Sequence, residues 1–99
     1  MNPSSALNLT VNFIKEQKQV IAYSPALDIS TVGKSEERAK KRFEEMVHIF
    51  FKDIADRNVL SEVLTELGWT KTAPENKSIK PQWVPPEITS VDLQIPVMA

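Results

Sequence analysis

The stretch IAYSPALDISTVGKSEERAKKRF, residues 21–43, changes its hydrophobic period at Gly33. Before this glycine, β-favouring residues are interrupted at Pro25 and resume in the LDISTV run, which predicts two short strands joined by a bend. After it, Ser35 precedes two glutamates, which is typical of a helix start. The serine hydroxyl can accept from free N–H groups of the first turn, and acids suit the positive end of the helix dipole.

An alternating run before this stretch predicts one more strand. From residue 7 to residue 14, leucine, valine and phenylalanine alternate with asparagine and threonine, which is the period of a strand with one buried face. The polar sequence KEQK, residues 15–18, separates this run from QVIAY, residues 19–23. Two β-rich runs across a short polar gap indicate a hairpin.

Two helices are expected after Ser35. The apolar residues of the first recur at spacings of three and four, which predicts an amphipathic helix of about five turns. A second, shorter helix is expected over residues 58–67, capped by Asp56 or Asn58 at its start and by a left-handed Gly68 after its end. Trp69 is expected to pack back onto the core. The apolar stripe of the first helix consists of Ala39, Phe43, Met46, Val47, Phe50, Phe51 and Ile54.

The remaining residues predict a connector and a final strand. Residues 70–87 are rich in proline and show no helical period, whereas residues 88–97 alternate again, with apolar residues from Val91 to Val97 on one face. The order β-β-β-α-α-β predicts a single α+β domain over residues 1–99. We expect two layers, in which a small antiparallel-rich sheet carries the long helix on one face.

Composition excludes several classes of function. The 12 basic and 13 acidic residues leave a net charge of −1, so no strong overall field favours nucleic acid or a membrane. The chain has no cysteine, which excludes disulfides, thiol nucleophiles and cysteine-ligated metals. The first residues lack the pattern of a signal peptide, and no run of about 18 apolar residues occurs. We therefore expect a cytoplasmic protein.

The residues that could carry chemistry are better explained by the fold. His48 is the only histidine and falls beside the apolar stripe, where a surface position is expected. Asp28, Glu36 and Glu37 are too few for a two-metal site, and the two glutamates suit the helix start. The sequence VGKS, residues 32–35, lacks the earlier glycine of a phosphate loop. We expect no catalytic residue, cofactor or metal.

Trp83 is the large anchor of the proline-rich segment. Tryptophan is enriched in binding hot spots, and it also pins loops onto small cores. The proline-rich surroundings keep Trp83 from a regular core position, so both an interface and an intramolecular contact stay open. The residues predicted at a partner or oligomer interface are Trp83, Val84, Ile88, Val91 and Leu93.

The opening stretch resembles the start of a HicB-family antitoxin. In that family a hairpin is followed by a tyrosine or similar residue, a proline, a short strand, a glycine and an acid-rich helix start. The sequence DRNVLSEVLTELGW, residues 56–69, resembles the second helix of compact members, and the HicB-like core spans residues 7–69. The residues that carry the resemblance are Tyr23, Pro25, Asp28, Gly33, Ser35, Glu37 and Ala39.

The resemblance implies a partial ribonuclease-H-like fold and an antitoxin function. Such an antitoxin binds and blocks a small HicA-type messenger-RNA interferase, usually as a homo-oligomer. Many members also carry a C-terminal DNA-binding domain, whereas Ala99 here comes shortly after the predicted last strand, so the resemblance does not carry direct DNA binding over to this chain. Two alternatives stay open. One is an orphan structural module that acts as a homo-oligomer, and the other is a small metal-dependent nuclease built around Asp28 or His48.

Overall fold

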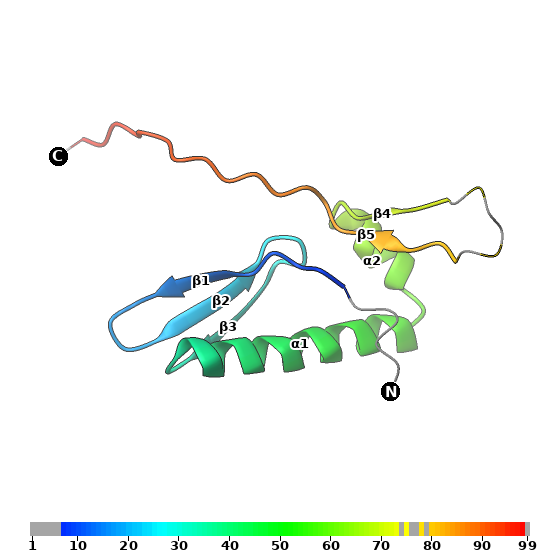
Figure 1. Ribbon diagram of the computed structural model, residues 1–99, viewed down its shortest axis with the longest axis horizontal. Helices are drawn as coiled ribbons and strands as arrows, with labels where there is room; N and C mark the ends of the chain where they lie inside the picture. Colours follow the sequence, from blue (N-terminus) through cyan, green and yellow to red (C-terminus); the bar gives the residue numbers. More distant parts are fainter. Residues whose placement is uncertain (1–6, 74, 76–77, 79, 99) are drawn as a thin grey trace.

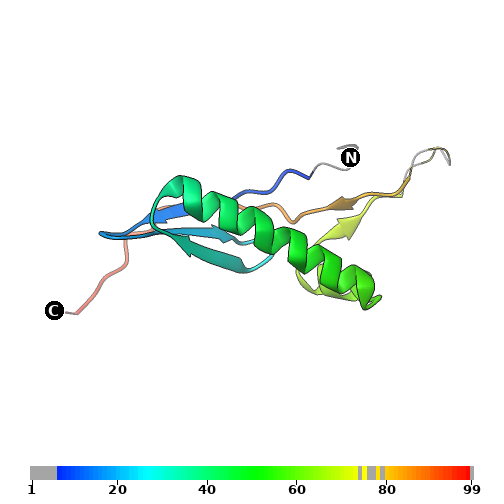
Figure 2. The same ribbon diagram turned by 90° about the horizontal axis from the view of Figure 1, so that it is seen from below.

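The computed structural model describes residues 7–73, 75, 78 and 80–98. Its β1, β2 and β3 form an antiparallel sheet in that order, β4 pairs with β5 in a second small sheet, and α1 lies along one face of the first sheet (Figures 1 and 2). The predicted α+β class is therefore confirmed. The elements are β1 (Asn12–Lys15), β2 (Val20–Ser24), β3 (Ile29–Gly33), α1 (Glu36–Asp56), α2 (Leu60–Glu66), β4 (Thr70–Lys71) and β5 (Trp83–Val84).

The joints between β2, β3 and α1 have the predicted chemistry. The chain turns after Ser24, whose carbonyl accepts a hydrogen bond of 2.8 Å from the amide of Asp28, and Asp28 itself has a φ of 54°. Gly33 ends β3 at a close approach to α1, where a β-carbon would lie 2.5 Å from the backbone nitrogen of Ala39. Ser35 caps α1, and its Oγ accepts from the amide of Arg38 at 3.2 Å. These short-range contacts fix the path from sheet to helix.

Buried side chains form two clusters, one near each end of α1. Near its start, Ala39 and Phe43 pack against Val20 and Ala22 of β2. Near its end, α1 packs against α2 and the β2–β3 turn through buried Ala26, Leu27, Ile54, Leu64 and Trp69.

Trp69 joins the second cluster to the turn between β2 and β3. Its indole is only 2% exposed, and Nε1 donates a hydrogen bond of 2.8 Å to the carbonyl of Ala26, 43 residues earlier in the chain. The ring also meets Phe51 edge to face, with centroids 6.3 Å apart. The predicted core position of Trp69 is confirmed.

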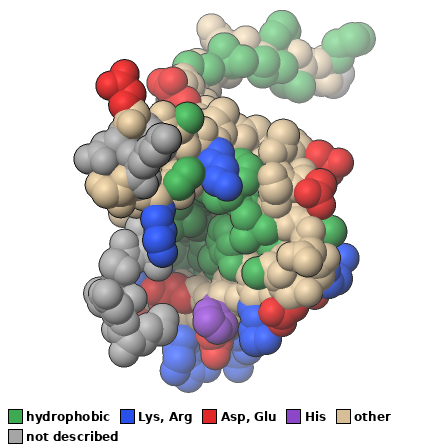
Figure 3. Space-filling view, turned by 90° about the vertical axis from the view of Figure 1, so that its right-hand side faces the viewer, with side chains coloured by type: hydrophobic (Ala, Val, Ile, Leu, Met, Phe, Trp, Pro, Cys, Tyr) green, Lys and Arg blue, Asp and Glu red, His purple; other side chains and the backbone are tan. Residues whose placement is uncertain are grey.

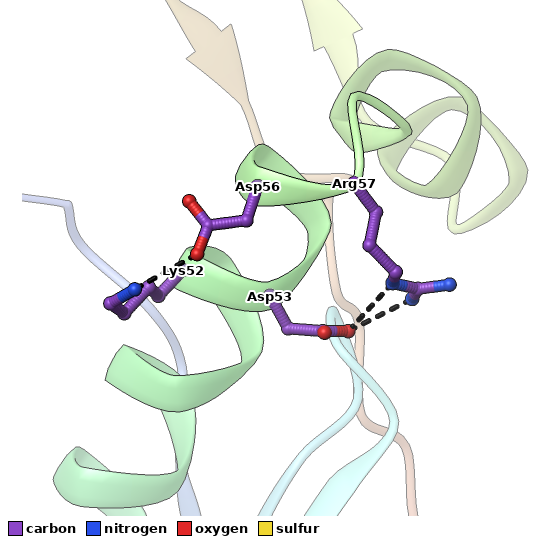
Figure 4. Close-up of polar contacts among 4 residues, drawn as sticks. All are labelled: Lys52, Asp53, Asp56 and Arg57. Carbon is purple, nitrogen blue, oxygen red and sulfur yellow. Dashed lines mark hydrogen bonds and ion pairs between the residues drawn. The ribbon is translucent and has the colours of Figure 1, made fainter.

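The C-terminal end of α1 carries two acids where the helix dipole disfavours them. Each has a basic partner four residues away, as Figure 4 shows: Lys52 Nζ lies 2.8 Å from Asp56, and Arg57 lies 2.9 Å from Asp53. Exposed pairs of this kind stabilise a helix by about 0.3–0.5 kcal/mol each. In the described part of the chain, neither helix has the length and apolar character needed to cross a membrane.

The second helix matches its prediction at one end only. α2 ends before Gly68, whose φ of 90° is the expected left-handed cap. At its start, the predicted caps Asp56 and Asn58 are both wrong. Val59 occupies the N-cap position without a side-chain hydrogen bond, and Asn58 instead turns the chain with a φ of 60°.

The C-terminal third differs from its prediction in two places. Residues 70–87, expected as a proline-rich connector, contain the paired strands β4 and β5, in which Thr70 faces Val84 and Lys71 faces Trp83. Residues 88–97, predicted as a final strand, form no strand and extend past the main sheet along the length of the molecule (Figures 1 and 2). Alternation alone does not make a strand, because its backbone groups need a neighbouring strand to bond.

Candidate partner-binding site

A long apolar groove of about 1330 Å³ lies beside α1. The segment before β1 and β1 itself form one wall, α1 forms the other, and α2 with the strand β5 closes one end. Figure 3 looks into this hollow, where hydrophobic side chains cover the interior. Its lining includes Leu7, Leu9, Val11, Phe13, Phe43, Val47, Phe51, Leu60, Leu64, Trp69, Trp83, Val84 and Pro85.

The groove exists because α1 has a wider apolar face than the sheet covers. The helix packs over β2 and β3, so the helix-side residues of the β1 segment, Val11 and Phe13, are only half-buried. Opposite them, Val47 and Phe51 of α1 are also half-buried. Apolar surface left open between two elements is typical of ligand and partner sites.

One rim of the groove is charged. Glu36, Lys40, Glu44 and His48 follow one another along α1 at intervals of four residues, and all four line the groove. The histidine is visible at this rim in Figure 3. Glu36 is also 3.6 Å from Lys15 at the end of β1, so a weak exposed ion pair spans the open side between strand and helix.

The structure brings together two of the five predicted interface residues. Trp83 and Val84 form β5 and line the closed end of the groove, and Lys71 Nζ lies 5.8 Å from the centre of the Trp83 ring. Ile88 is half-buried beyond this end, whereas Val91 and Leu93 are exposed and lie outside the groove. Their role in an interface stays a prediction.

The segment after β5 presents a row of exposed apolar side chains. We call residues 87–98 the C-terminal tail. Val91, Leu93, Ile95 and Val97 alternate with polar residues or Pro96, and they are between 65% and 87% exposed. In extended chain, alternate residues share one face, so these four side chains form an apolar stripe without a covering layer.

The residues considered for catalysis do not converge. His48 is exposed on α1, whereas Asp28 lies in the β2–β3 turn and accepts a hydrogen bond of 3.1 Å from Tyr23 Oη. This hydrogen bond to Asp28 raises the pKa of Tyr23 above 10.0, with burial and the carboxylate charge adding to the effect. Within the ranges that the structure describes, no three potential metal ligands of the His, Cys, Asp or Glu types come together.

Sequence reasoning missed the groove, although it found most of the residues that form it. Val47 and Phe51 were assigned to the stripe that packs on the sheet, and Leu9 and Val11 to the buried face of a strand. What the sequence does not encode locally is the lateral offset between α1 and β1. One available signal was that two alternating segments, residues 7–14 and 88–97, both offered an apolar face to a single helix.

Comparisons with protein-family models, curated proteins and solved structures find no match to this chain. The fold and the groove are therefore known from the structure of this chain alone, and the resemblance to HicB antitoxins stays a prediction.

Proposed function

We propose that this chain is a non-enzymatic, HicB-like antitoxin that binds and neutralises a small HicA-type messenger-RNA interferase. The observation that carries the proposal is the apolar surface that two parts of the molecule leave open. It comprises the groove beside α1 and the C-terminal tail that leaves from the groove's closed end at Pro85. Soluble monomers rarely expose contiguous apolar patches of this kind unless a partner covers them.

The C-terminal tail is an extended segment that could pair with a strand of another protein. Its backbone is extended, its apolar side chains from Val91 to Val97 share one face, and it makes no strand pair in this chain. An extended segment binds another protein by adding to a sheet edge, where main-chain hydrogen bonds give affinity and alternate side chains give specificity. The tail would bind the toxin in this way.

Charge favours a basic partner. The segment 85–98 contains the acids Glu87 and Asp92 and has no lysine, arginine or histidine. An enzyme that cleaves RNA binds the phosphate backbone through basic side chains. An acidic and apolar segment complements such a surface, and laying it there would keep RNA from the site.

The direct test uses a HicA-type toxin encoded beside this chain. Its RNA cleavage is measured with increasing amounts of the wild-type protein, of Leu93→Asp and of the matched control Gln94→Asp. Both variants add one negative charge to the tail, but only the first removes a side chain from the apolar stripe. We expect wild type and Gln94→Asp to inhibit equally, and Leu93→Asp to bind about tenfold more weakly or worse.

Three results would contradict the proposal. The first is undiminished RNA cleavage at saturating wild-type protein. The second is equal inhibition by both variants, which would remove the tail from the interface. The third is divalent-ion-dependent RNA cleavage by the purified chain itself that is lost in Asp28→Asn, since this would identify an enzyme.

A further inference from the structure

We propose that two copies of this chain pair through their β3 edges, antiparallel and about a twofold axis near Thr31. The pairing would join the two sheets into one and place the two α1 helices side by side on the same face. The β3 edge is the opposite edge of the sheet from β1 and the groove, because the strand order is β1-β2-β3. The dimer therefore does not depend on the proposed binding of a toxin.

The β3 edge has backbone groups directed outward. In an antiparallel pair, alternate residues bond to the neighbouring strand. The amide of Glu16 bonds to the carbonyl of Gln19 at 2.9 Å, so Gln19 and every second residue after it in β2 face β1. The remaining residues of β2 face β3 and pair there with Gly33, Thr31 and Ile29.

Ser30 and Val32 are consequently the residues whose amide and carbonyl groups point away from β2. The Val32 carbonyl accepts a hydrogen bond of 3.1 Å from Arg42 Nη1, as expected for an outward-facing oxygen. With the axis at Thr31, Ser30 of each copy faces Val32 of the other, and each such pair exchanges two hydrogen bonds. Arg42 would release the carbonyl when the second strand arrives.

The β3 edge lacks the protection that the β1 edge has. Natural sheets discourage edge pairing with lysine, proline or bulges. β1 ends in Lys15, and Lys18 follows in its turn. β3 reads ISTVG, without a charged residue or a proline. Of the two edges, β3 is therefore the one whose sequence permits another strand.

Exposed apolar side chains flank the β3 edge from both layers. Val32 on the open face of the sheet is 41% exposed, and Met46 and Ile49 on α1 are 44% and 60% exposed. Together with Ser30, Thr31, Arg42 and Glu45 they line a shallow depression of about 400 Å³. A second β3 strand would cover Val32, and a second α1 would cover Met46 and Ile49.

The spacing of the layers suits this arrangement. Each α1 packs across β2 and β3. Neighbouring strands lie about 4.8 Å apart, so two helices that each sit above a β2–β3 pair would be about 10 Å apart across the new strand pair. Packed helices lie about 8–10 Å apart, so the helices would touch without a clash.

The charges on this face of α1 are self-complementary. Arg42 and Glu45 border Met46 and line the same depression. A twofold axis makes the two helices antiparallel, which brings Arg42 of one copy toward Glu45 of the other, twice. A second copy of this chain thus satisfies the charge pattern as well as the apolar one.

The test is the oligomeric state of the full chain by analytical ultracentrifugation. We expect the wild type to dimerise, and Ile49→Glu to raise the dissociation constant about tenfold or more. The matched control Ala55→Glu introduces the same acid at an exposed residue about 120° around α1 from Ile49 and outside the depression, and it should leave the dimer intact.

A mixing experiment separates this interface from any other. Arg42→Glu makes this border of the depression wholly acidic and Glu45→Arg makes it wholly basic, so each variant alone should be monomeric. Mixed in equal amounts, the two should form a heterodimer, because every cross-pair is then of opposite sign. A monomeric wild type, a dimer that survives Ile49→Glu, or a mixture that stays monomeric would each overturn the proposal. Circular dichroism confirms that each variant is folded.

Discussion

Replacing Trp69 by phenylalanine tests how the second half of the chain is held to the sheet. The substitution removes the only hydrogen bond that joins the indole to the Ala26 carbonyl, a buried contact of 2.8 Å. A buried carbonyl left without its partner costs about 1–3 kcal/mol. The smaller ring leaves a void beside Phe51, which the neighbouring side chains fill only in part. We therefore expect Trp69→Phe to lower the free energy of unfolding by about 2–4 kcal/mol.

Urea unfolding measures this loss, and Trp83 provides the control. Trp83→Phe changes the other tryptophan of the chain, which is half-buried in the small β4–β5 sheet, and should cost less than about 1 kcal/mol. The two variants also leave one fluorophore each, so the unfolding of each region is followed separately by fluorescence and compared with circular dichroism. Equal losses in the two variants, or a loss below about 0.5 kcal/mol for Trp69→Phe, would refute the assigned role of the Ala26 hydrogen bond.

Four further substitutions test local features of the fold. Gly33→Ala should destabilise by about 2 kcal/mol or more in urea unfolding, because its β-carbon would lie 2.5 Å from a backbone nitrogen of α1. Ser35→Ala should cost about 1 kcal/mol through loss of the N-cap, and an unchanged midpoint would contradict this. Ser24→Ala should stabilise slightly, because Ser24 Oγ is buried with no hydrogen-bond partner among the described residues. The hydrogen bond from Tyr23 to Asp28 raises the pKa of Tyr23, so it stabilises the fold below pH 10.0, and this stabilisation is lost as the pH rises through the folded pKa. Ultraviolet titration should show the pKa of Tyr23 return toward 10.0 in Asp28→Asn.

The proposed dimer and the proposed toxin binding use different surfaces of the molecule. Ile49 lines the depression at the β3 edge, whereas Leu93 belongs to the C-terminal tail and lines neither that depression nor the groove. Each substitution should therefore affect one kind of binding and spare the other. A monomeric Ile49→Glu that still inhibits the toxin would show that the two surfaces are independent.

The sequence alone determines the elements whose signals are local. Ser35 caps the helix that the following glutamates predict, Gly33 permits a close approach of strand and helix, and the spacing of apolar residues predicts a long α1. These features depend on contacts between residues close in the chain, so backbone geometry and short side chains suffice to fix them.

The tertiary structure decides what depends on distant residues. Trp69 donates a hydrogen bond to Ala26, 43 positions earlier in the chain, and β4 pairs with β5 across the proline-rich segment. The groove results from the offset between α1 and β1. Residues 88–97 form no strand, because none of the strands that the structure describes pairs with them. The same alternation appears in residues 7–14 and 88–97, yet only the first contributes to the main sheet. A period of two specifies which side chains share a face, and only a neighbouring strand decides whether that face is buried.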